Sequence, residues 1–131
     1  MKLEDQVVSL ELAKKLKELG VKQESLFYWN TRHIWVSYYK HIKKAPVDFG
    51  DEIISAYTVA ELGEMLPSDV TVIETDEKCH FLAIETTGYG KLKKWYLSYG
   101  DRQYLEHEAD TEADARASML IYLLENKLIT L

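Results

Sequence analysis

The stretches VVSLELAKKLKELGVKQESLFYW (residues 7–29) and DTEADARASMLIYLLENKL (residues 110–128) decide the fold and enclose a middle rich in strand-forming residues. In the first stretch, Leu12, Leu16 and Leu19 recur at the spacing of one helix face. Lysines and glutamates occupy the intervening positions. This pattern predicts an amphipathic helix that lays one side on a core.

The sequence also contains signals for both ends of this first helix. Ser9 is of the residue type that begins helices, and Gly20 stands where a left-handed residue ends one. Val21 would then face Leu16 across the helix end. A competing interpretation is a DNA-reading helix-turn-helix with a second helix from Gln23, but the aromatic residues that follow favour a strand.

The last helix is predicted to begin near Thr111, where nearby acids suit the positive end of its dipole. Its predicted buried stripe consists of Ala113, Ala117, Leu120, Ile121 and Leu124. Met119, Tyr122 and Leu123 widen the apolar surface beyond one side. This breadth is explained either by a dimer partner or by a helix lying deep in a small core.

Two N-terminal sequence motifs predict the start of a short middle helix. Thr58 and Glu61 form a T-x-x-E capping box, and Tyr57 with Leu62 supplies the hydrophobic staple around it. Pro67 disfavours helical geometry in the preceding residue, so the helix is predicted to end near residue 66.

The stretch from residue 70 to residue 108 is predicted to be an antiparallel meander. Gly100-Asp101 has the composition of a two-residue turn between the last two strands. The loop sequence GYGK at residues 88–91 has glycines and a lysine, but it joins two strands and lacks the spacing of a phosphate-binding loop. The predicted strands are 70–75, 79–86, 92–99 and 102–108.

These elements predict an α+β fold in which an antiparallel sheet of about four to five strands is covered by the N- and C-terminal helices on one face. The short middle helix is placed at an edge. The 131 residues, with 47% apolar and 29% charged side chains, predict one domain over residues 1–131.

The best candidate binding surface is the stretch 33–41, HIWVSYYKH, where period two sends side chains to alternate faces. Aromatic rings beside cations are what stacking on a nucleotide requires. A half-buried sheet face or a subunit contact accounts for the same pattern. The candidate residues are Arg32, His33, Trp35, Tyr39, Lys40, His41, Lys43 and Lys44.

The net charge of −6 is unevenly distributed. Residues 1–50 carry nine Lys/Arg against six Asp/Glu, whereas residues 51–131 carry seven against sixteen. This asymmetry favours charge-complementary protein partners or head-to-tail self-association, and the acidic total disfavours nucleic acid. With no long apolar run, no signal peptide and a lone cysteine at position 79, we expect a soluble cytoplasmic protein without a membrane segment or disulfide.

The sequence contains no motif that is typical of a catalytic site. His33, His41, His80 and His107 lack the spacing of a metal motif, and no cofactor is expected. Cys79 and His80 would point to opposite faces of a strand, so they are poorly placed as nucleophile and base. Four glutamates on or near predicted strands are interpreted as surface charges, with paired-carboxylate chemistry only if two converge: Glu74, Glu85, Glu106 and Glu108.

Three segments of the chain resemble a family of small uncharacterised proteins encoded by bacteriophages, prophages and other mobile elements of bacteria. The segments are residues 7–29, AYTVAELGEMLP at 56–67, and ADARA at 113–117 continuing to Leu128. The resemblance covers about half of the chain and implies an accessory protein in a bacterial cytoplasm. It supplies no catalytic or binding residues.

We therefore expect a non-enzymatic protein that binds a host or phage protein or assembles with itself. The alternative is a protein that binds or sequesters a nucleotide on the aromatic and basic segment 32–44. DNA binding is a third and weaker alternative.

Overall fold

The computed structural model describes residues 2–30, 33–36, 53–72, 75–80, 82–100 and 105–131. Three α-helices, two 3₁₀ turns and short strands alternate along this part of the chain. In chain order they are η1 (Leu3–Asp5), α1 (Leu10–Glu18), β1 (Phe27–Asn30), β2 (His33–Val36), β3 (Ile53–Ser55), α2 (Val59–Met65), β4 (Asp69–Val72), β5 (Glu77–His80), β6 (Leu82–Thr87), η3 (Gly90–Leu92), β7 (Lys94–Tyr99), β8 (Glu106–Ala109) and α3 (Glu112–Glu125).

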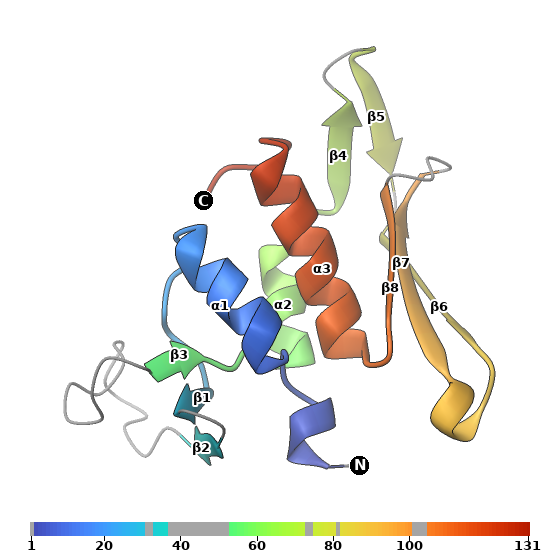
Figure 1. The fold of residues 1–131 in the computed structure, drawn as a ribbon. Helices are drawn as coiled ribbons and strands as arrows, with labels where there is room; N and C mark the ends of the chain where they lie inside the picture. Colours follow the sequence, from blue (N-terminus) through green and yellow to red (C-terminus); the bar gives the residue numbers. More distant parts are fainter. Residues whose placement is uncertain (1, 31–32, 37–52, 73–74, 81, 101–104) are drawn as a thin grey trace.

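The C-terminal helix α3 lies at the centre of the arrangement (Figure 1). It contacts α1 and α2 on one side and strands β7 and β8 on the other. Ala113, Ala117 and Leu120 of its predicted stripe are fully buried, and so are Met119 and Leu123 beyond the stripe. The wide apolar surface of this helix is therefore accounted for by its central position in the core.

The α+β class is confirmed, but the strands form three small antiparallel sheets in place of the single sheet that we expected. Their strand orders are β2-β1-β3, β4-β5 and β6-β7-β8. Alternation along a segment indicates that it is a strand, but not which distant strand it pairs with. The terminal helices consequently cover different sheets, because α1 packs on β3 while α3 packs on β7 and β8. The middle helix packs on α3.

Helix α1 ends as its sequence predicts. Gly20 has a φ of +87°, its N–H donates to the carbonyl of Lys17, and the Val21 N–H donates to the carbonyl of Leu16 at 3.0 Å. These two bonds make a Schellman motif. Ser9 is the N-cap residue, but its side chain accepts no capping bond; instead its N–H donates to Asp114 Oδ1 of α3 at 2.7 Å.

Helix α2 has the predicted capping box. The Glu61 N–H donates to Thr58 Oγ1, and Glu61 Oε2 accepts from the Thr58 N–H at 2.7 Å. The staple residues Tyr57 and Leu62 are fully buried. The helix ends at Met65, and Leu66 before the proline is extended.

Two predictions in the meander are wrong in detail. The predicted strand 79–86 is two strands, β5 paired with β4 and β6 paired with β7. The last hairpin is present, but a two-residue turn after Tyr99 would set Ser98 opposite Gln103, whereas Ser98 pairs with Glu106. Asp101 of the predicted turn lies within residues 101–104, which are outside the described residues.

The core joins the three sheets and the three helices in one cluster. Trp29 of β1 lies in this cluster, and its indole N–H donates to the Val8 carbonyl at 2.8 Å. Tyr99 of β7 is fully buried and donates to the Pro67 carbonyl at 2.6 Å. These bonds satisfy polar groups that burial would otherwise leave without partners. Within the described residues, no helix has the length and apolar character needed to cross a bilayer.

Candidate functional site

Most of the predicted binding segment 32–44 lies outside the described residues. This applies to Arg32, Tyr39, Lys40, His41, Lys43 and Lys44. The backbone of His33 and Trp35 lies in β2, where they pair with Asn30 and Tyr28 of β1. The nucleotide-binding interpretation of this segment stays a prediction.

Other sequence motifs can be placed. The chain after α1 continues into strand β1 and not into a second helix, so the helix-turn-helix interpretation is wrong. Cys79 is buried and the adjacent His80 is exposed, which confirms that the two side chains point to opposite faces of β5. Among the described residues, no three or more His, Cys, Asp and Glu side chains gather as a metal site.

The most exposed apolar side chains lie where strands β6 and β7 are joined. This connection, residues 88–93, is here called the hairpin tip. Tyr89 is 89% exposed and Leu92 is 80% exposed. Gly88 has a φ of +74°, and a Cβ there would lie 2.6 Å from the Leu92 carbonyl oxygen. The glycine therefore allows the tight turn that presents both apolar side chains to solvent.

The hairpin tip is also basic. Lys91 and Lys93 are exposed, and the tip contains no acid. In a protein of net charge −6, this places a local positive charge beside two apolar groups. Lone exposed apolar residues are ordinary, but an adjacent apolar and basic pair of this kind suits contact with an acidic protein surface.

A second surface lies on the β6-β7-β8 sheet, on the face opposite α3. Glu85 and Glu108 pair with Tyr96 from its two sides, and Glu106 pairs with Ser98. Paired residues of antiparallel strands share a face, so the three glutamates line one face of the sheet. All three are exposed. This surface, here called the acidic face, confirms the interpretation of these glutamates as sheet-face charges; Glu74 lies outside the described residues.

The two faces of this sheet differ because of α3. Leu97, next to Tyr96 in β7, points to the opposite side and is fully buried. His107 of β8 packs against Tyr122 of α3, with ring centroids 5.0 Å apart. The apolar alternate positions therefore face the helix, and the acidic positions between them face solvent.

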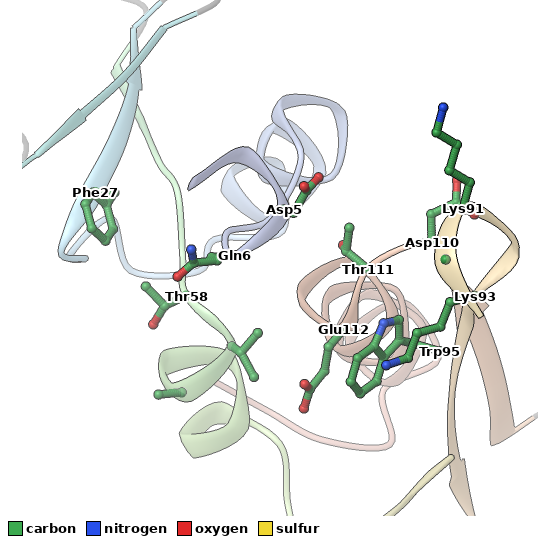
Figure 2. Close-up of a pocket in the computed structure, with 13 residues that line it drawn as sticks. Asp5, Gln6, Phe27, Thr58, Lys91, Lys93, Trp95, Asp110, Thr111 and Glu112 are labelled. Atoms are coloured by element: carbon green, nitrogen blue, oxygen red, sulfur yellow. The ribbon is translucent and has the colours of Figure 1, made fainter. Parts of the chain in front are cut away.

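A groove of about 730 Å³ lies between the N-terminal turn, β1, the first turns of α2 and α3, and the hairpin tip, which contributes Gly90, Lys91 and Lys93. Figure 2 shows Phe27 and Trp95 on opposite sides of this groove, with Asp5 between them and Lys93 lying beside Trp95. The Lys93 Nζ lies 4.7 Å from the centroid of the Trp95 ring. Such an arrangement is a cation–π contact.

Two acids that line the groove are already paired. Asp110 accepts from the Lys94 ammonium, and this hydrogen bond raises the pKa of Lys94. Glu112 accepts from Arg116 at 2.9 Å and 3.2 Å, through Nη2 and Nε. The charges of both carboxylates are thus compensated within the protein.

The search for known relatives finds no matching family model, curated protein or solved structure. The functional argument consequently depends on the surfaces of this chain. Sequence reasoning missed the hairpin tip because the GYGK loop was weighed only as a phosphate loop. The signal available was Tyr89 and Leu92 among lysines, in a glycine-bearing connection between two strands.

Proposed function

We propose that this protein is a non-enzymatic, self-assembling module in which the hairpin tip of one copy docks on the acidic face of the next. In keeping with the family resemblance, we place it among accessory proteins of phages, prophages or mobile elements, acting in the bacterial cytoplasm. The observation that carries the proposal is the presence, on one molecule, of a basic apolar tip and an acidic sheet face.

Charge complementarity supports this pairing. Lys91 at the tip has no carboxylate partner among the described residues, and neither Glu85 nor Glu108 takes part in an ion pair there, although the charge of Glu108 contributes to the raised pKa of Lys94. Opposite charges on two patches steer encounter and fix register, while burial of Tyr89 and Leu92 contributes the apolar part of the contact. Tyr96, half-buried between the two glutamates, offers an aromatic surface for the incoming side chains.

The contact is heterologous, because it joins two different surfaces. A heterologous contact generates a ring when the rotation closes and an open chain of subunits when it does not. We expect assembly to grow with protein concentration and to weaken with added salt, because exposed charges are screened over about 10 Å at 0.1 M ionic strength.

Sedimentation velocity at low salt tests the proposal. Lys91→Glu, Glu108→Lys and Tyr89→Ser should each reduce the oligomeric fraction. Lys78→Glu and Leu131→Ser are matched controls, because they change an exposed lysine of β5 and an exposed leucine away from the tip. The controls should assemble as the unaltered protein does.

Mixing separates a tip-to-face contact from general charge effects. A tip variant (Tyr89→Ser) retains its acidic face, and a face variant (Glu108→Lys) retains its tip. Mixed together they should form one contact, giving a dimer that neither forms alone. A protein that is monomeric at every protein and salt concentration would contradict self-assembly. The two apolar tip residues would then be expected to bind a different protein.

A further inference from the structure

We propose that the groove beside the hairpin tip binds a small aromatic monocarboxylate, that is, a planar ring carrying a single carboxylate. This goes beyond the proposed assembly, which uses Tyr89, Lys91 and Leu92 of the tip and the opposite face of the sheet. Of these three tip residues, only Lys91 also lines the groove. The inference rests on the groove's two aromatic walls, the Lys93 ammonium beside one of them and the size of the groove.

The walls can hold a ring. Phe27 and Trp95 are half-buried, and both pack against the core, so that the parts facing the groove are held in place. Figure 2 shows the two rings on opposite sides of the groove. Aromatic surfaces favour offset or edge-to-face contacts with another ring, each contributing about 0.5–1.5 kcal/mol beyond the burial of area.

The charges favour one negative group. Asp110 and Glu112 are compensated by Lys94 and Arg116. Lys93 has no carboxylate partner among the described residues, and its contact with Trp95 places its ammonium at the ring. Lys91 also lines the groove, but Figure 2 shows its side chain pointing away from Trp95. A ligand whose ring lies on the indole thus meets the ammonium with its carboxylate.

Asp5 limits the charge of the ligand. Its carboxylate faces the groove from η1 and has no cationic partner among the described residues. It would repel a second negative charge on the same ligand. The volume of about 730 Å³ falls within the range of about 300–1,000 Å³ common for small-molecule sites.

Phenylacetate is the probe for this site, and the readout is the indole N–H resonance of Trp95 in ¹H–¹⁵N NMR, assigned with the Trp95→Phe variant. Benzyl alcohol lacks the charge and acetate lacks the ring. Phenylacetate should shift the Trp95 resonance at lower concentration than either. Equal potency of phenylacetate and benzyl alcohol, or shifts confined to Trp29 and Trp35, would overturn the proposal.

Two substitutions test the charges. Lys93→Gln should weaken phenylacetate binding by up to about fivefold, which corresponds to one exposed ion pair of up to about 1 kcal/mol. Lys78→Gln on β5 is the control and should leave binding unchanged.

Phenyl phosphate, which is close to a dianion at neutral pH, should bind more weakly than phenylacetate. Asp5→Asn should reduce this difference in affinity between the two ligands. Tighter binding of phenyl phosphate by the unaltered protein, or unchanged phenylacetate binding by Lys93→Gln, would contradict the assignment.

These measurements do not depend on assembly. They are made on the Tyr89→Ser variant as well as on the unaltered protein, because Tyr89 does not line the groove. Binding by both proteins supports the groove whether or not tip docking occurs. Loss of binding in Tyr89→Ser alone would contradict the separation of the two surfaces.

Discussion

Asp114 links the starts of two helices that are 105 positions apart in the chain. Its carboxylate accepts from the Ser9 N–H at 2.7 Å, while its own N–H donates to Thr111 Oγ1. Burial raises the pKa of Asp114, and the bonds from Ser9 only partly oppose this effect. One side chain therefore fixes the N-terminus of α1 against α3 and bears a desolvation cost.

The free energy of unfolding should depend on pH in a way that reflects the raised pKa of the Asp114 carboxyl group. Because its folded-state pKa is raised, folding favours the protonated form, and its contribution to the free energy of unfolding is lost as pH rises from about 3.8 through the folded-state pKa. The stability of the unaltered protein relative to Asp114→Asn should therefore fall across that window. Urea unfolding at a series of pH values measures the difference, with Glu125→Gln as the control for loss of an acid from α3. A difference that is constant or grows with pH would contradict the prediction.

Gly20 permits a second residue-scale prediction. Its φ of +87° is costly for L-residues, and a Cβ there would meet only a Leu131 side-chain carbon at 3.8 Å. Gly20→Ala should therefore lower the free energy of unfolding by about 1–2 kcal/mol through backbone strain alone. Gly20→Asn should cost less, because asparagine tolerates this conformation. Chemical denaturation of the three proteins gives the comparison, and equal stability of the unaltered protein and the Gly20→Ala variant would rule out strain at this position.

At the scale of elements, helix α2 depends on its capping residues. It has only seven residues, Val59–Met65, which is too short to be stable without tertiary contacts and caps. Glu61 accepts from the Thr58 N–H and, through its other oxygen, from the Leu26 N–H at 2.9 Å. The capping box therefore also ties α2 to the residue that precedes strand β1.

Thr58→Ala should lower the free energy of unfolding by about 0.5–2 kcal/mol, because the Glu61 N–H loses its side-chain acceptor. Glu64→Ala is the matched control, since Glu64 is exposed on the same helix and has no capping role. The two are compared by thermal or urea unfolding. Equal effects of Thr58→Ala and Glu64→Ala would show that the cap does not stabilise α2.

The whole molecule is organised around α3. Leu120 is fully buried at the centre of a core to which all three sheets and all three helices contribute. A single shared core predicts one cooperative unfolding transition for residues 1–131. Far-UV circular dichroism and tryptophan fluorescence should give the same midpoint, and Leu120→Ala should lower the free energy of unfolding by about 2–5 kcal/mol in both.

Ser118→Ala, a half-buried position on the same helix, is the control for that change. It should alter stability far less than Leu120→Ala. Separate midpoints for the two spectroscopic signals would mean that the sheets unfold apart from the helices and would contradict the single domain.

The sequence by itself determined the local structure of this protein. The Schellman end at Gly20, the capping box from Thr58 to Glu61 and the start of α3 at Thr111 were all predictable. Each of these depends on residues within about five positions of one another, so the physical cause is contained in the local sequence. Burial of Leu16 and Leu120 followed from periodicity for the same reason.

Only the tertiary structure decided how these parts meet. The division into three sheets, the register that sets Ser98 against Glu106, and the bond between Ser9 and Asp114 join residues whose pairing no local pattern specifies. The same applies to the candidate surfaces: the acidic face brings Glu85 and Glu108 to either side of Tyr96, and the groove is lined by Phe27 and Trp95 from opposite sides. Strand pairing and helix packing depend on the whole core, because each buried face must find a partner among all the others.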